Sequence, residues 1–156
     1  MGYFIGVILQ TVLLPVLSGG LELGIGGGDP IEVFGRWWVF WGVGTRLLVA
    51  GCVQLLRPDT TARILGSAEA TPAEVQVARE LSMANVGMGL AGLLALVPVW
   101  APAAGAAGGA FLLAAGLMHV RKTGKSPQEL LATWSDLLVG VVVVVFVVYA
   151  LVARPA

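Results

Sequence analysis

The sequence predicts an all-helical integral membrane protein, built as a bundle of about five transmembrane helices. Of its 156 residues, 58% are hydrophobic and only 12% are charged. The mean hydropathy of +0.92 lies far above that of a soluble domain. The apolar residues gather in long runs, each close to the ~20 residues that a helix needs to cross a bilayer. The 22 glycines favour helices whose backbones pack closely.

These apolar runs give the expected helices, within a single transmembrane domain that covers residues 1–156. We expect helices at about residues 3–18, 34–57, 73–98, 102–120 and 127–152. Thr71 and Glu74 match a capping box, as do Ser126 and Glu129, and proline holds the first helical position in both. The first run has the length of a secretory signal, but no Lys or Arg precedes it, so we expect a retained helix. A short surface helix is expected at residues 59–65.

A glycine-rich connection, residues 18–30, follows the first run. It lacks the Lys-Ser/Thr pair of a phosphate-binding loop, and both of its charges, Glu22 and Asp29, are acidic. We therefore expect a flexible acidic loop. Within the first run, Pro15 predicts a kink, and Gln10 is a lone amide of the kind that ties membrane helices together.

The third run carries small residues on both sides of its expected helix. At about 100° per residue, one side holds Ser82, Asn85, Gly89 and Gly92, and the nearly opposite side holds Glu80, Ala84, Gly87 and Ala91. Small residues at this spacing let helices approach closely in lipid. We expect both sides to take a close neighbour, and the packing residues to be Ser82, Gly87, Gly89 and Gly92.

Charges alternate between the connections and indicate the topology. The first connection carries acidic residues, Glu22, Asp29 and Glu32, whereas the second and fourth carry bases, namely Arg57, Arg63, Arg79, Arg121, Lys122 and Lys125. Because excess Lys and Arg marks the cytoplasmic side, we expect a multi-pass protein of the inner (cytoplasmic) membrane with a cytoplasmic amino terminus. Arg154 is the one residue at odds with this topology.

Two charged residues, Arg46 and Asp136, are expected to lie deep within the membrane. A guanidinium near the bilayer centre costs at least ~2.5 kcal/mol on insertion scales, so Arg46 needs a partner, which the sequence leaves open between Asp136 and Glu80. In this topology the polar residues share the cytoplasmic half, where they could line one pocket: Arg46, Gln54, Glu80, Asn85, His119 and Asp136. They could equally tie the helices into register, and both interpretations stand.

The remaining features argue against several classes of function. A net charge of zero gives no reason to expect a nucleic acid partner. Cys52 lies inside an apolar run, where we expect a small buried hydrophobe rather than a disulfide or a metal ligand. His119 lacks a second histidine as a co-ligand, so we expect no metal and no cofactor. The tryptophans Trp37 and Trp41 predict an aromatic belt at the membrane surface.

Glu80 and Asn85 lie near the start of the third helix, and Gly116 and His119 close the fourth, ahead of a last helix that contains Asp136. This arrangement in the second half of the chain resembles an uncharacterised bacterial family of small multi-helix inner-membrane proteins. The asparagines of that family after the histidine are absent here, since residues 126–133 contain none. Because the role of the family is unknown, the resemblance implies a fold and no activity.

Three functions are compatible with these features. The first is a non-catalytic packing or accessory subunit of a larger membrane transport or respiratory assembly, with the lipid bilayer and other membrane subunits or further copies of itself as partners. The alternative is a small transporter or binding protein for a proton-linked anionic or lipid-like solute, in which Asp136 and His119 exchange protons and Arg46 holds the ligand. A membrane enzyme with Glu80 or His119 as general base is least favoured, because no electrophilic partner or cofactor motif accompanies the base.

Overall fold

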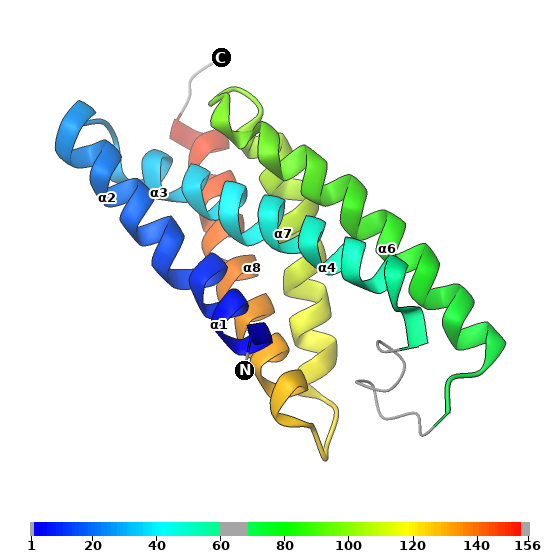
Figure 1. Cartoon of the computed structure of the whole chain (residues 1–156). Helices are drawn as coiled ribbons and strands as arrows, with labels where there is room; N and C mark the ends of the chain where they lie inside the picture. Colours follow the sequence, from blue (N-terminus) through cyan, green and yellow to red (C-terminus); the bar gives the residue numbers. More distant parts are fainter. Residues whose placement is uncertain (1, 60–68, 154–156) are drawn as a thin grey trace.

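The computed structural model describes residues 2–59 and 69–153, and within them the chain forms a bundle of long helical segments without strands (Figure 1). The elements in order are α1 (Gly2–Ile8), the π-helical segment η1 (Leu9–Leu13), α2 (Leu14–Gly26), α3 (Pro30–Trp38), the π-helical segment η2 (Val39–Thr45), α4 (Arg46–Leu56), α6 (Pro72–Leu93), the 3₁₀ turn η3 (Leu94–Leu96), α7 (Ala101–Val120) and α8 (Pro127–Ala153). The predicted helical bundle is confirmed.

Within the part of the chain that the structure describes, four helical segments are long and apolar enough to cross a membrane. They are Gly2–Gly26, Pro30–Leu56, Ala101–Val120 and Pro127–Ala153. The helix α6 is not among them, since its first turns carry Glu74, Arg79 and Glu80. The apolar helices fit a bilayer environment, and α6 combines an apolar second half with a polar start.

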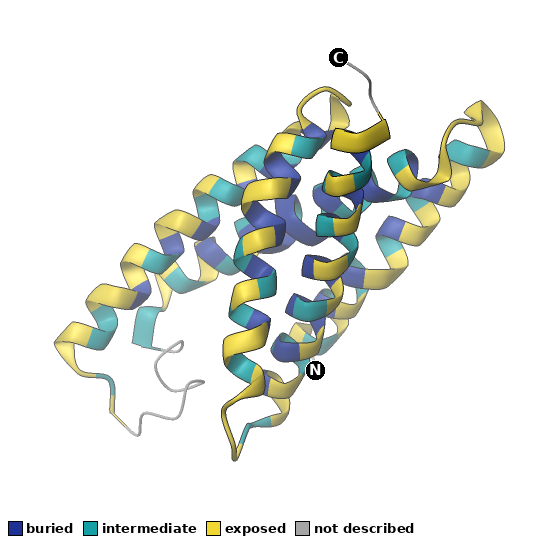
Figure 2. Ribbon diagram, turned by 180° about the vertical axis from the view of Figure 1, so that it is seen from behind, coloured by how far each residue is buried: buried dark blue, intermediate teal, exposed yellow. Residues whose placement is uncertain are grey.

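Two helix pairs organise the bundle, α7 with α8 and α4 with α6. The amino terminus lies at the same end as the α7–α8 turn, and the last described residues lie at the opposite end, with the α2–α3 and α6–α7 turns (Figure 1). Buried residues line the inward faces of the helices (Figure 2). Val39, Val43, Val139 and Val143 are fully buried at the centre, together with Leu112.

The first connection differs from the flexible loop expected over residues 18–30. The first helical segment continues to Gly26, because Glu22 accepts hydrogen bonds from Arg36 and from the Trp37 indole of α3 and so holds this extension against its neighbour. The helix ends where Gly27 and Gly28 take positive φ values of 67° and 118°. The next helix begins at Pro30 rather than near residue 34.

Helix caps account for several other boundaries. The Asp29 carboxylate accepts from the backbone N–H groups of Ile31 at 2.9 Å and Glu32 at 3.0 Å. Thr71 and Glu74 form the predicted reciprocal capping box of α6. At the start of α8, Ser126 accepts from the Glu129 N–H at 3.2 Å, while the Glu129 carboxylate bonds Lys122. The surface helix expected at residues 59–65 falls almost entirely outside the described residues.

Small residues bring η2 and α4 into backbone contact with α6. A Cβ added to Gly92 would lie 2.5 Å from the Gly44 nitrogen, and one added to Gly89 would lie 2.5 Å from the Leu48 nitrogen. Ser82 is fully buried on the same side of α6. Gly87 differs from the expectation, since a Cβ added there would meet nothing within 4 Å. Of the two small-residue sides of α6, one is therefore packed within the described chain and the other is open.

Candidate functional site

The most deeply buried charged contact joins α4 to α8. Arg46 Nη2 lies 2.5 Å from Asp136 Oδ1 and donates a second hydrogen bond to Ser135 Oγ at 2.8 Å. Both charged side chains are only 10% exposed. Of the two partners that the sequence left open for Arg46, the structure selects Asp136. A buried pair of this kind holds its two helices in one register, because separating the charges in an apolar interior is costly.

A π-helical segment places Arg46 at the start of α4. The Arg46 backbone N–H donates a hydrogen bond to the carbonyl of Trp41, five residues earlier. The Thr45 hydroxyl donates to the same carbonyl at 2.8 Å. The extra residue in this turn changes the helical phase and therefore the direction of every later side chain. The opposing segment η1 lies beside η2, and Gln10 donates to Thr45 Oγ1 at 3.2 Å between them.

The first half of α8 carries a polar inward face. Glu129, Thr133 and Asp136 follow one another at helical spacing and are all buried. Thr133 donates its hydroxyl hydrogen to the Glu129 carbonyl at 2.7 Å, and Ser135 donates to the Ala132 carbonyl at 3.0 Å. Spacing in the sequence could have shown this face, since the residues repeat at i, i+4 and i+7, but the prediction singled out Asp136 alone.

The six residues of the predicted polar cluster fall in separate places. Arg46 and Asp136 form the pair described above, whereas Asn85 of α6 donates to Gln54 Oε1 of α4 at 2.8 Å. Glu80 is exposed and accepts from Gln76 at 2.8 Å on its own helix. His119 is half-buried near the end of α7, where its backbone carbonyl accepts from the Lys122 N–H at 3.1 Å. The described contacts thus resemble ties between particular helices more than one shared pocket.

A seam of indole hydrogen bonds, missed by the sequence analysis, joins the first two helical segments. Trp37 donates to Glu22 Oε2 at 2.7 Å, Trp41 to Ser18 Oγ at 3.0 Å and Trp38 to the Thr11 carbonyl at 3.0 Å. These half-buried tryptophans connect the two helical segments, a role that the sequence analysis did not assign to them. The Thr11 carbonyl is available because Pro15, four residues later, has no N–H to donate to it.

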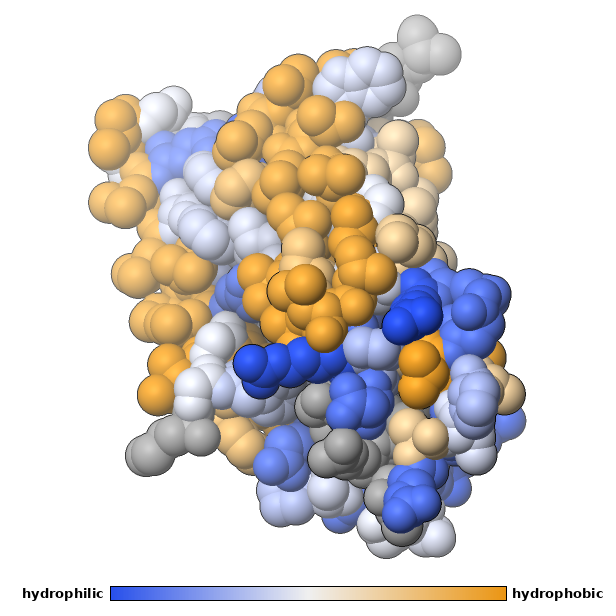
Figure 3. Space-filling model, turned by 45° about the vertical axis from the view of Figure 1, so that its right-hand side comes forward, coloured by the Kyte–Doolittle hydropathy of each residue, from blue (hydrophilic) through white to orange (hydrophobic). Residues whose placement is uncertain are grey.

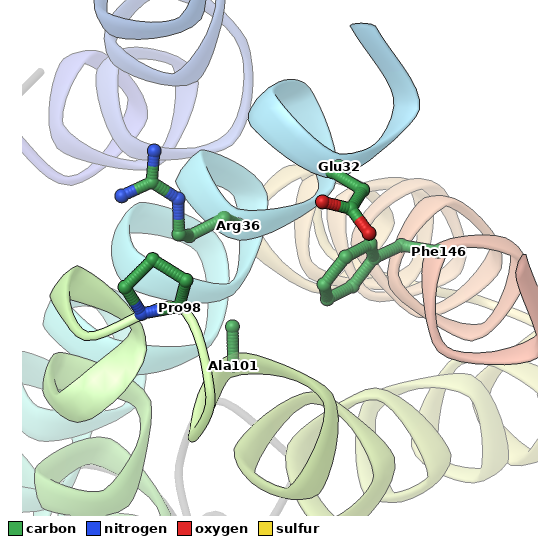
Figure 4. A pocket seen from close by; sticks show the side chains of 5 residues that line it. All are labelled: Glu32, Arg36, Pro98, Ala101 and Phe146. Atoms are coloured by element: carbon green, nitrogen blue, oxygen red, sulfur yellow. The ribbon is translucent and has the colours of Figure 1, made fainter. Parts of the chain in front are cut away.

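The cavities near the surface of the described residues include a small one and a shallow one. One of about 20 Å³ is lined by Glu32, Arg36, Pro98, Ala101 and Phe146, and has room for one water molecule (Figure 4). The other is a shallow apolar depression of about 210 Å³, lined by Ala91, Leu94, Trp100, Ala103, Ala104 and Ala107 between α6 and α7. Neither is lined by Arg46 or Asp136.

Three further observations concern reactive groups. Cys52 is exposed on α4, contrary to the expected buried position, because the inward side of α4 is taken by Arg46, Leu47 and Gly51. Hydrogen bonds from the Glu32 N–H, the Tyr149 hydroxyl and the Ile31 N–H hold the pKa of Asp29 below its ordinary value. Within the described residues, no group of three His, Cys, Asp or Glu side chains is placed to hold a metal ion.

The helical bundle, its apolar outer surface and its buried ion pair define an apolar, membrane-type helical protein. The chain belongs to a family of unknown function, DUF6790, whose family model matches residues 3–155. The predicted resemblance to an uncharacterised family is thereby confirmed. No curated protein and no solved structure matches the chain.

Proposed function

We propose that this protein is a non-catalytic subunit of a larger membrane assembly and that it binds a transmembrane helix of another subunit through one surface. This surface, the alanine-glycine face, consists of Ala84, Gly87 and Ala91 on α6 and Ala103, Ala107 and Ala110 on α7. The observation that carries the proposal is that five of these small residues are exposed, while the sixth, Ala91, is half-buried. Ala91, Ala103 and Ala107 line the apolar depression between the two helices.

The alanine-glycine face contrasts with the bulky residues found elsewhere on the outer surface. The outward residues of the first helical segment are bulky, among them Ile5, Ile8 and Leu17, and α8 presents Val141 and Val145. Bulky aliphatic residues suit contact with lipid, whereas small residues let another backbone approach within van der Waals contact. The face therefore suits a helix better than it suits acyl chains.

The interior supports a structural role. Arg46 bonds Asp136 and Ser135, Gln54 bonds Asn85, and the indole seam joins the first two segments. Each contact links two helices, so the polar groups contribute to holding the bundle that presents the face. Transport or respiratory assemblies of the inner membrane are the partners that we propose for such a subunit.

The first test is the composition of the assembly extracted from its native membrane in mild detergent. We expect other polypeptides to remain bound at fixed stoichiometry, and their chemistry then defines the function. Extraction of the chain alone, or as a homo-oligomer, would overturn the proposed subunit role.

Site-directed crosslinking tests the face itself. In a Cys52→Ser background, Ala107→Cys is expected to crosslink to the partner subunit in native membranes. Ile8→Cys, on the bulky surface of the first segment, is the matched control and is expected to give no crosslink. Equal crosslinking from both positions contradicts the proposed face.

The proposed orientation places the amino terminus in the cytoplasm. Thr123→Cys in the α7–α8 turn should then react with a membrane-impermeant maleimide only after the cytoplasmic side is opened. Val99→Cys in the α6–α7 turn should react in intact cells. The reverse pattern would refute the assignment from charge.

One observation favours the alternative, a small transporter or binding protein for a proton-linked anionic or lipid-like solute. Within the described residues, Arg46 Nη1 is buried without a hydrogen-bond partner, so the guanidinium retains donors that a ligand acceptor could use. Asp136→Asn separates the two proposals. Loss of solute binding by a folded protein favours the transporter, and loss of folding or assembly favours the subunit.

A further inference from the structure

The turn between α7 and α8 is a compact basic structure at one end of the bundle. We propose that this turn, residues 121–125, binds the phosphate headgroup of an acidic phospholipid, whose acyl chain lies against Leu130 and Trp134 of α8. This proposal does not depend on the alanine-glycine face or on a partner subunit.

Hydrogen bonds within the chain hold the turn in a fixed shape. Lys122 Nζ lies 2.5 Å from the buried Glu129 carboxylate, which anchors the turn to the first turn of α8. Lys125 Nζ donates to the Val120 carbonyl at 3.2 Å and to the Lys122 carbonyl at 2.6 Å. Gly124 has a φ of 70°, which permits the reversal of direction. An ordered turn loses little conformational freedom when it binds a headgroup.

The charge of the turn remains positive after these internal contacts. Glu129 offsets one of the three bases, and the carbonyls that accept from Lys125 carry no net charge. Arg121 is exposed in the same turn. A guanidinium and an ammonium that belong to one turn can both donate to the oxygens of a phosphate group. At the opposite end of the bundle the exposed or half-exposed charges include Glu22, Asp29 and Glu32, which would repel such a group.

The apolar surface next to the turn favours a lipid over a soluble anion. Leu130 and Trp134 lie one helical turn apart on α8 and are 49% and 66% exposed. Trp134 is seven residues beyond Pro127, or about 10 Å along the helix. This is the depth at which tryptophan residues meet the boundary between headgroups and acyl chains. Hydrophilic residues gather toward this end of the molecule and apolar residues above it (Figure 3).

The test measures which lipid occupies the surface around Trp134. The full chain is reconstituted in phosphatidylcholine nanodiscs that contain increasing fractions of brominated phosphatidylglycerol or of brominated phosphatidylcholine with the same acyl chains. Bromine quenches nearby tryptophan emission, and subtraction of the Trp134→Phe signal isolates Trp134. We expect phosphatidylglycerol to quench Trp134 at a lower mole fraction, by about five-fold or more.

Variants at exposed positions assign the preference to the turn. Arg121→Gln should reduce the preference about five-fold, Arg121→Glu should reduce it further, and Arg121→Lys should retain most of it. Arg57→Gln removes an exposed arginine at the same end outside the turn and should leave the preference unchanged. Thermal unfolding in the same nanodiscs verifies that each variant is folded.

Three outcomes would overturn the proposal. Equal quenching by the two lipids shows that the surface does not select the headgroup. An equal loss in Arg57→Gln and Arg121→Gln assigns the preference to the general charge of this end. Removal of the preference by inorganic phosphate at constant ionic strength identifies a site for a soluble anion.

Discussion

The two sides of α6 carry similar small residues but differ in how closely other parts of the chain pack against them. On the closed side, Gly89 lies against the backbone of α4 and Gly92 against that of η2. The Arg46–Asp136 pair joins α4 to α8. On the open side, Gly87 meets nothing within 4 Å, and Ala91 lines a shallow depression shared with α7. Small residues thus permit close packing but do not specify which helix packs against them. The closed side of α6 packs against other segments of this chain, whereas at Gly87 on the open side no described residue fills that place.

The largest expected effect comes from the ion pair that joins α4 to α8. Asp136→Leu leaves the Arg46 guanidinium buried without its counter-charge, which should cost about 3–5 kcal/mol of unfolding free energy. The double variant Arg46→Met with Asp136→Leu replaces both charges by apolar groups and should recover most of this loss. Thermal unfolding in detergent measures both. A double variant as unstable as the single one would contradict a purely structural role for the pair.

A smaller effect should distinguish the two sides of α6 directly. Gly89→Ala places a methyl group 2.5 Å from the Leu48 backbone nitrogen, which cannot move as a side chain could, so we expect a loss of about 1–3 kcal/mol. Gly87→Ala is the matched control on the open side. It should change the stability of the isolated chain by less than ~0.5 kcal/mol. Equal losses at the two positions would remove the distinction between a closed and an open side.

The indole seam should contribute less than the glycine contact. Trp38→Phe keeps an aromatic ring but removes the N–H that bonds the Thr11 carbonyl, which should cost about 1–2 kcal/mol. Combining it with Pro15→Ala restores a backbone donor four residues after Thr11 and should reduce that cost. If the Trp38 effect is the same in both backgrounds, the indole does not replace the donor that proline lacks.

Local rules predicted much of the fold, because they act within a few residues. The capping box at Thr71 and Glu74 places the start of α6 within one residue, and the apolar runs identify the long helices. The helix over residues 18–26 could not be predicted from local sequence, because its four glycines weaken helix propensity. The contact of Glu22 with α3 compensates for that weakness. Tertiary contacts therefore decided the element that local propensity assigned to a loop.

The sequence predicted which residues form the candidate site better than it predicted which of them contact one another. The cost of an intramembrane charge identified Arg46 and Asp136, but the choice of partner depends on the phase of α4, which the π-helical segment η2 changes. No spacing signalled that segment. The exposure of Cys52 has the same origin, because a shift in helical phase redistributes the inward and outward residues of α4.

The smallest expected effect concerns the end of the bundle where α8 meets the start of α3. The hydrogen bonds that Asp29 accepts lower its pKa in the folded state, so the charged form is favoured by folding. This contribution is fully present above the unfolded pKa of about 4 and is lost as the pH falls through the lower folded pKa. Asp29→Asn keeps a side chain that caps α3 but removes the charge. The melting temperature of the wild type should therefore fall more steeply below about pH 4 than that of Asp29→Asn, and parallel curves would show that this carboxylate does not couple folding to pH.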